Sequence, residues 1–106
     1  MSNSTRRQQE LRQALRRLAP LIPFADSQPV LERAAKLTRA DLSVGAALWL
    51  ALVAHLRHRH TDYDSLLAEG YDRDAARHFV VEETEEVLRR WGCARQIDVE
   101  AEDKNS

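Results

Sequence analysis

The sequence contains few of the residues that stabilise specialised folds. Its 106 residues include one cysteine, three glycines and three prolines. The single cysteine, Cys93, excludes a disulfide within the chain and fits a reducing compartment. So few glycines and prolines exclude collagen-like and low-complexity structures, and they argue against a many-stranded β fold.

Long hydrophobic segments are also missing. The longest apolar run, residues 44–54, covers eleven positions, whereas a helix that crosses a bilayer needs about 20. The first ten residues contain no apolar segment of the kind found in secretory signals. We therefore expect a cytoplasmic protein that has no membrane partner.

The net charge is close to zero but unevenly distributed. Residues 1–60 hold ten basic and four acidic side chains, a formal charge of +6, whereas residues 61–106 hold six and thirteen, a charge of −7. This segregation predicts that the halves attract each other or that one of them faces a charged partner. The length and the 43 % hydrophobic content fit one domain. We place that domain at residues 1–97, followed by an acidic, disordered tail at 98–106.

The apolar residues recur with the period of a helix rather than of a strand. Leu11, Ala14, Leu15 and Leu18, for example, share one helical face. Residues 44–56 are apolar nearly all round, which predicts a helix that is covered on several sides. We therefore expect an all-α fold, a compact bundle of about five helices around this central apolar helix. The expected helices lie at about 6–18, from a cap at Asp26 or Ser27, and at about 43–60, 62–69 and 73–91.

Short polar residues and glycines mark the expected helix ends. Caps are expected at Asp41 or Ser43, at Thr61 and at Asp72. Gly70 and Gly92 fit the left-handed conformation that ends a helix. Gly45 lies inside the central helix and predicts the close approach of a neighbour. In the last helix we expect a buried stripe that includes Phe79 and Val80.

Residues 55–64 hold the densest group of polar side chains, with three of the four histidines. We interpret this stretch as a junction whose polar groups hold the bend between two helices. Arg77 lies one turn after Arg73 and is expected to pair with Asp62 or Asp64. The residues assigned to the junction are His58, His60, Thr61, Tyr63, Asp64, Gly70, Arg73 and Arg77.

The same stretch permits two kinds of chemistry. His58 and Asp62 are four residues apart and could bind a metal together with His60. Alternatively, His60 could act in acid–base catalysis with Asp62 or Asp64. However, the chain has no His-Glu-x-x-His motif, no paired Cys/His spacing and no nucleophile linked to a base. We therefore expect no metal, no cofactor and no catalytic residue, and we rank a metal-binding or hydrolytic site third among the possible functions.

The N-terminal helix offers the main basic surface. It holds five arginines against one glutamate, Glu10, and no aromatic residue on which bases could stack. The two helices expected at 62–69 and 73–91 have the lengths found in a helix-turn-helix motif. However, the second helix is acidic and would repel phosphates. We therefore expect a non-enzymatic binding or regulatory protein that contacts a protein partner, or a second copy of itself, through Arg12, Arg16 and Arg17. Nucleic-acid binding through the same helix is the alternative.

The segment that begins at Arg57 carries a recognisable motif. It reads Arg57-His58-x-His60-Thr61-Asp62-Tyr63-Asp64, then Leu66-Leu67, Gly70-Tyr71-Asp72-Arg73 and Ala76-Arg77, and it closes with Leu88-x-x-Trp91. Over residues 42–92 this pattern resembles a bacterial and fungal family known as domain of unknown function 2293. The resemblance implies a compact helical module without an established activity.

Overall fold

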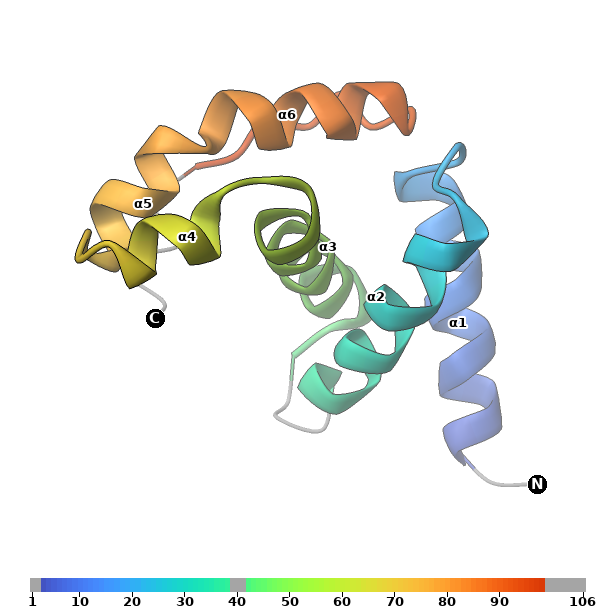
Figure 1. Cartoon of the computed structure of the whole chain (residues 1–106). Helices are drawn as coiled ribbons and strands as arrows, with labels where there is room; N and C mark the ends of the chain where they lie inside the picture. Colours follow the sequence, from blue (N-terminus) through green and yellow to red (C-terminus); the bar gives the residue numbers. More distant parts are fainter. Residues whose placement is uncertain (1–2, 39–41, 99–106) are drawn as a thin grey trace.

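The computed structural model describes residues 3–38 and 42–98, which form six helices (Figure 1). The helices are α1 (Asn3–Leu18), α2 (Phe24–Thr38), α3 (Val44–His60), α4 (Tyr63–Ala68), α5 (Arg73–Phe79) and α6 (Val81–Arg90). No strand occurs in these two segments, so the all-α prediction is confirmed. None of the described helices combines the length and the apolar character that crossing a membrane requires.

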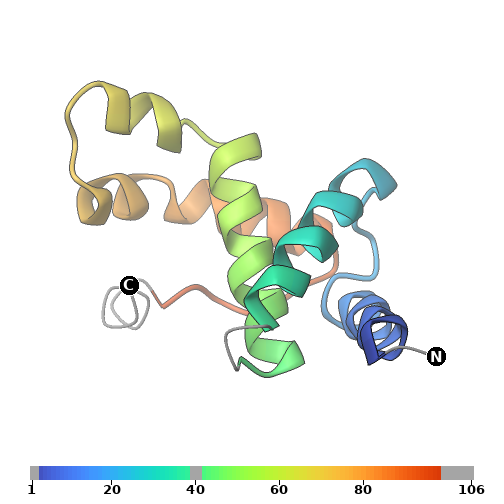
Figure 2. The same cartoon turned by 90° about the horizontal axis from the view of Figure 1, so that it is seen from below.

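Helix α3 lies at the centre of the bundle, as its composition predicts. It contacts α1, α2, α4 and α6, and most of its residues from Ala47 to Arg57 are buried (Figures 1 and 2). The hydroxyl of Ser43 caps α3 by accepting the N–H of Ala46, whereas Asp41 lies outside the described residues. The expectation for Gly45 is wrong. A Cβ at this exposed position would meet no atom of the described residues within 4 Å.

The apolar side chains form two separate clusters. The larger cluster joins α1, α2, α3 and α6 through residues such as Leu15, Val30 and Leu88. The smaller one consists of Tyr63, Ala76 and Val80, and it holds the α4–α5 hairpin that projects from one end of α3 (Figure 2). The described part of the molecule is consequently elongated, with extents of 47 × 28 × 21 Å.

The prediction of a single helix at residues 73–91 is wrong in one respect, because the helix is interrupted at Val80. Val80 has φ −103° and ψ 5°, and α5 ends before it while α6 begins after it. The side chain of Val80 belongs to the small cluster, whereas Val87 and Leu88 belong to the large one, so the chain must turn between them. The buried hydroxyl of Thr84 donates to the carbonyl of Val80, a bond that favours bending. The bend leaves Phe79 exposed, edge-on to Tyr71, and not in the predicted buried stripe.

Two predicted starts of helices also shift. Helix α1 begins three residues earlier than expected. Helix α2 begins at Phe24, because the carbonyl of Pro23 accepts the backbone N–H groups of Asp26 and Ser27. Asp26 therefore lies within the first turn of α2 and not at the predicted cap.

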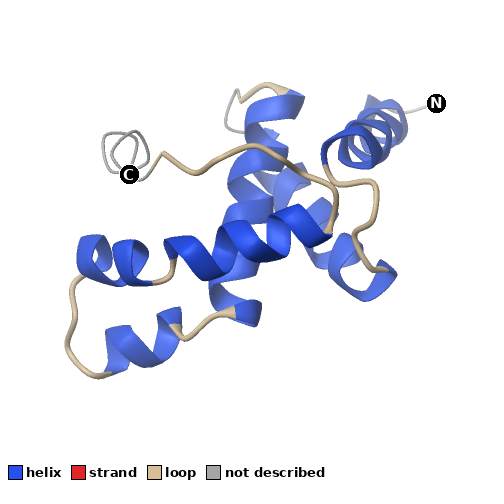
Figure 3. Cartoon of the chain, turned by 90° about the horizontal axis from the view of Figure 1, so that it is seen from above, coloured by secondary structure: helices blue, strands red, loops and turns tan. Residues whose placement is uncertain are grey.

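A backbone hydrogen bond joins the residue after the C-terminal end of α6 to the loop between α1 and α2. Gly92 has φ 86°, as expected for a residue that ends a helix, and the backbone of Leu21 donates to the carbonyl of Trp91 at 2.9 Å. The chain then runs back across the bundle (Figure 3). Along this path Cys93 is buried in the large cluster, and the guanidinium of Arg95 lies 4.1 Å from the centre of the Trp49 ring. The predicted tail begins at Asp98, and its remainder lies outside the described residues.

Candidate functional site

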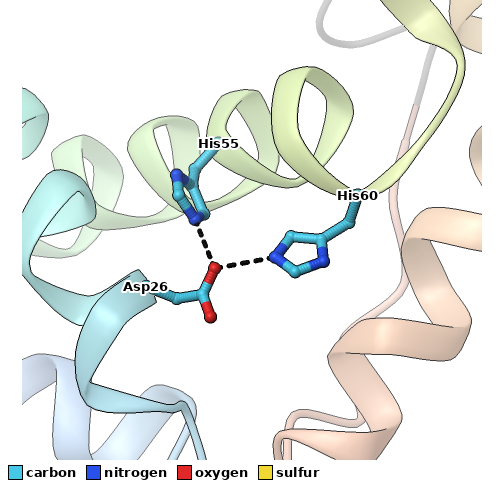
Figure 4. A group of neighbouring side chains, drawn as sticks. All are labelled: Asp26, His55 and His60. Atoms are coloured by element: carbon cyan, nitrogen blue, oxygen red, sulfur yellow. Dashed lines mark hydrogen bonds and ion pairs between the residues drawn. The ribbon is translucent and has the colours of Figure 1, made fainter.

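Three polar side chains from two helices meet at one point beside the end of α3. The ring nitrogens Nε2 of His55 and His60 both lie against Oδ1 of Asp26, at 2.8 and 2.7 Å (Figure 4). A carboxylate oxygen only accepts hydrogen bonds, so both imidazoles donate to it. We call Asp26, His55 and His60 the His–Asp cluster.

Burial and charge define the environment of this cluster. The exposed fractions of the side chains are 7 % for His55, 16 % for Asp26 and 33 % for His60. Burial raises the pKa of the Asp26 carboxyl, but the hydrogen bonds and charges of His60 and His55 outweigh it, so the pKa lies below its ordinary value of 3.8. The rings of His60 and the buried Trp91 meet edge to face, with their centres 5.3 Å apart. The cluster is therefore mostly buried, and His60 is the member most accessible to solvent.

The chain positions these groups for simple reasons. Asp26 lies in the first turn of α2, where the helix dipole favours a carboxylate. His55 follows the apolar run of α3 and faces α2, the helix that α3 packs against. His60 is the last residue of α3, and its ring reaches the carboxylate of Asp26 from there. Chemically, one carboxylate oxygen and two imidazole nitrogens make up a ligand set suited to transition metals.

Sequence reasoning missed two of these three residues. His60 was assigned to the helix junction, but His55 and Asp26 were not, and the hypothesis that placed His58 and Asp62 beside His60 does not describe the structure. His55 itself was a signal, because it is a polar residue that directly follows the apolar run 44–54 of a helix expected to be buried. Asp26 is predicted only as a possible helix cap, and nothing in the sequence links it to His55, which lies 29 residues away in the chain.

The junction between α3 and α4 uses the other members of the polar stretch. The hydroxyl of Thr61 donates to the carbonyl of Arg57 at 2.6 Å and accepts the N–H of Tyr63 at 3.2 Å. Thr61 therefore links the two helices, although the N-cap position of α4 is Asp62, whose side chain makes no capping bond. Nδ1 of His58 lies 2.6 Å from a carboxylate oxygen of Asp64.

The remaining junction residues surround the α4–α5 hairpin. Gly70 has φ 106°, the positive value expected after α4, and the side chain of Asp72 caps α5. Arg73 and Arg77 line a hollow of about 250 Å³ together with Arg57, His58 and Tyr63. Asp64 is one of the two acidic residues, Asp62 and Asp64, predicted as partners of Arg77, and its carboxylate pairs with His58.

A second surface of interest lies between α1 and α2, which we call the α1–α2 groove. It has a volume of about 320 Å³ and combines two of the predicted contact residues, Arg12 and Arg16, with apolar side chains. Arg17 is exposed on α1 but does not line this groove. The apolar lining consists of Leu15, Ala19, Pro20, Ile22, Phe24 and Leu31. Phe24 is 78 % exposed at its edge.

Comparison with known proteins identifies the family but no activity. A family model described as "Uncharacterized conserved protein (DUF2293)" matches residues 14–92. This segment begins well before residue 42, the first residue of the motif-bearing region described above. It includes the C-terminal part of α1, residues 14–18, and all of α2, and it contains all three residues of the His–Asp cluster. No curated protein and no solved structure was found to match the chain. Since the match covers most of its length, the chain belongs to this family of uncharacterised proteins.

Proposed function

We propose that this protein is a non-enzymatic binding module that holds an acidic, amphipathic segment of another protein in the α1–α2 groove. The observation that carries the proposal is the composition of the groove, in which two arginines adjoin a row of apolar side chains. None of the described residues that line it is acidic. A partner segment would bury apolar side chains against Phe24 and Leu31 and pair its carboxylates with Arg12 and Arg16.

The exposed aromatic side chain supports a protein rather than a nucleic-acid partner. Phe24 lies at the edge of the groove, and Leu21 in the adjoining loop is also strongly exposed. Aromatic and arginine side chains contribute most of the binding energy in many protein interfaces. An apolar row of this kind adds nothing to phosphate neutralisation, which dominates the binding of nucleic acids. A cytoplasmic location forms part of the proposal, because Cys93 is the only cysteine and is unpaired.

The test should change the groove without removing α1, because Leu11 and Leu15 of α1 are buried in the large cluster. A photo-reactive residue in place of Gln28, which lines the groove, would capture the partner in the cells that make the protein. The double substitution Arg12→Glu/Arg16→Glu should reduce capture about tenfold or more, because losing a close charge pair costs ~1.5 kcal/mol or more. Arg90→Glu, on the exposed end of α6, is the matched control and should leave capture unchanged.

Three results would contradict the proposal. Equal capture by the double variant and by wild type would show that the groove is not the contact surface. Fluorescence anisotropy with a labelled duplex and a labelled single strand would detect the alternative. Micromolar binding that weakens steeply with salt and depends on Arg12 and Arg16 would favour a nucleic-acid partner. Dimers lost in the double variant would instead identify a second copy of the chain as the occupant.

A further inference from the structure

We infer that the His–Asp cluster is a binding site for a divalent first-row transition-metal ion such as zinc. The inference concerns a different surface from the α1–α2 groove and does not depend on the proposed function. Its basis is that three donor atoms of suitable chemistry converge on one point: Oδ1 of Asp26 and Nε2 of His55 and His60 all lie within 4.8 Å of one another (Figure 4).

The two distances from the carboxylate oxygen to the ring nitrogens are close to those that a metal ion requires. Zinc binds imidazole nitrogen and carboxylate oxygen at about 2.0–2.2 Å, which places tetrahedral ligands roughly 3.3 Å apart. The two nitrogens now lie 2.8 and 2.7 Å from the oxygen, since each N–H donates to it. An ion that replaces these hydrogens would need each separation to widen by about half an ångström. Small side-chain rotations supply a change of this size.

The scaffold holds the donors and leaves one side accessible. His55 is almost fully buried where α3 packs against α2, and Asp26 is fixed in the first turn of α2. His60 retains an exposed side, through which an ion can enter and a water molecule can complete the coordination. Three protein ligands with one open position are typical of zinc sites that bind water.

Some of the charges near the cluster favour the binding of a cation and others oppose it. The carboxylate of Asp26 attracts a cation, and the C-terminal end of α3 at His60 contributes the negative end of a helix dipole. Against these, a hollow that also reaches His55 is lined by one acidic residue, Glu32, and by three basic residues, Arg33, Lys36 and Arg59. Their net positive charge reduces the attraction, so we expect binding in the micromolar range and not the far tighter binding of a structural zinc site.

The test is a titration of untagged, metal-free protein with zinc. Calorimetry and competition with a chromophoric chelator measure the stoichiometry and the affinity of binding. We expect one equivalent to bind. The substitutions Asp26→Asn and His60→Ala should each weaken binding by at least about tenfold, since even groups that only orient a ligand contribute ~10–100-fold. His78→Ala is the matched control, because this exposed histidine on α5 bonds only the carbonyl of its own helix, and it should bind as wild type does.

Cobalt provides an independent spectroscopic test. Its visible absorption reports nitrogen and oxygen ligands, and binding should quench the fluorescence of Trp91, whose ring centre lies 5.3 Å from that of His60. Circular dichroism would establish that each variant folds; if Asp26→Asn does not, His60→Ala decides, since His60 lies partly exposed at a helix end. The absence of saturable binding to wild type would overturn the inference. So would equal binding by His60→Ala, or loss of binding in His78→Ala.

Discussion

Replacing Gly92 by alanine should destabilise the protein strongly, because two separate costs arise at this position. Gly92 has φ 86°, and an L-residue pays about 1–2 kcal/mol in the left-handed region. An alanine Cβ would also lie 2.9 Å from Cγ and 3.1 Å from Cδ of Pro20, in a ring that is not free to rotate away. Crowding of this kind costs roughly 1–3 kcal/mol. The sum, about 2–5 kcal/mol, is a large share of the stability of a small domain.

Urea unfolding followed by circular dichroism measures this effect, with Gly70→Ala as the matched control. Gly70 also has a positive φ, but a Cβ there would meet no atom within 4 Å, so only the conformational cost applies. The double variant Gly92→Ala/Pro20→Ala should lose less stability than the two single variants together, because the shorter side chain removes the contact. If Gly92→Ala were no less stable than Gly70→Ala, or if the double variant were additive, the argument from the Pro20 contact would be refuted.

Two further substitutions test the α3 ends. Thr61→Val keeps the branched shape but removes the hydroxyl that links Arg57 and Tyr63; it should lower the free energy of unfolding by about 1–2 kcal/mol, whereas Thr61→Ser should not. Equal stabilities of the Val and Ser variants would show that these bonds contribute nothing. Gly45→Ala should raise the free energy of unfolding by up to ~1 kcal/mol, because the added methyl group meets no neighbour and improves helix propensity. A lower melting temperature for Gly45→Ala would contradict this reasoning.

Much of the fold could be predicted because helical periodicity and caps are local signals. The all-apolar character of residues 44–56 identified the central helix, and Asp72, Gly70 and Gly92 marked helix ends correctly. The break at Val80 could not be predicted, since the segment around it keeps a helical pattern. The turn arises because Val80 and Leu88 pack into different clusters.

For the candidate site, the sequence drew attention to the right stretch but not to the right partners. It placed His58 and His60 together at a junction, whereas their rings engage different helices: His58 pairs with Asp64 at the start of α4 and His60 with Asp26 of α2. Both histidines belong to α3, and residues two positions apart on a helix point to different sides. The signal for Asp26 was misread as a helix cap, since a carboxylate near a helix start fits either role.

The sequence alone determined that the chain is helical, where its central helix lies and which residues end most of its helices, because each depends on side chains a few positions apart. Tertiary packing decided everything that depends on distance in the chain. It brought Asp26 within 2.8 Å of two histidines from another helix and set the ring of Pro20 against Gly92. The crossing of helices fixes such contacts, and no local pattern records how two helices cross.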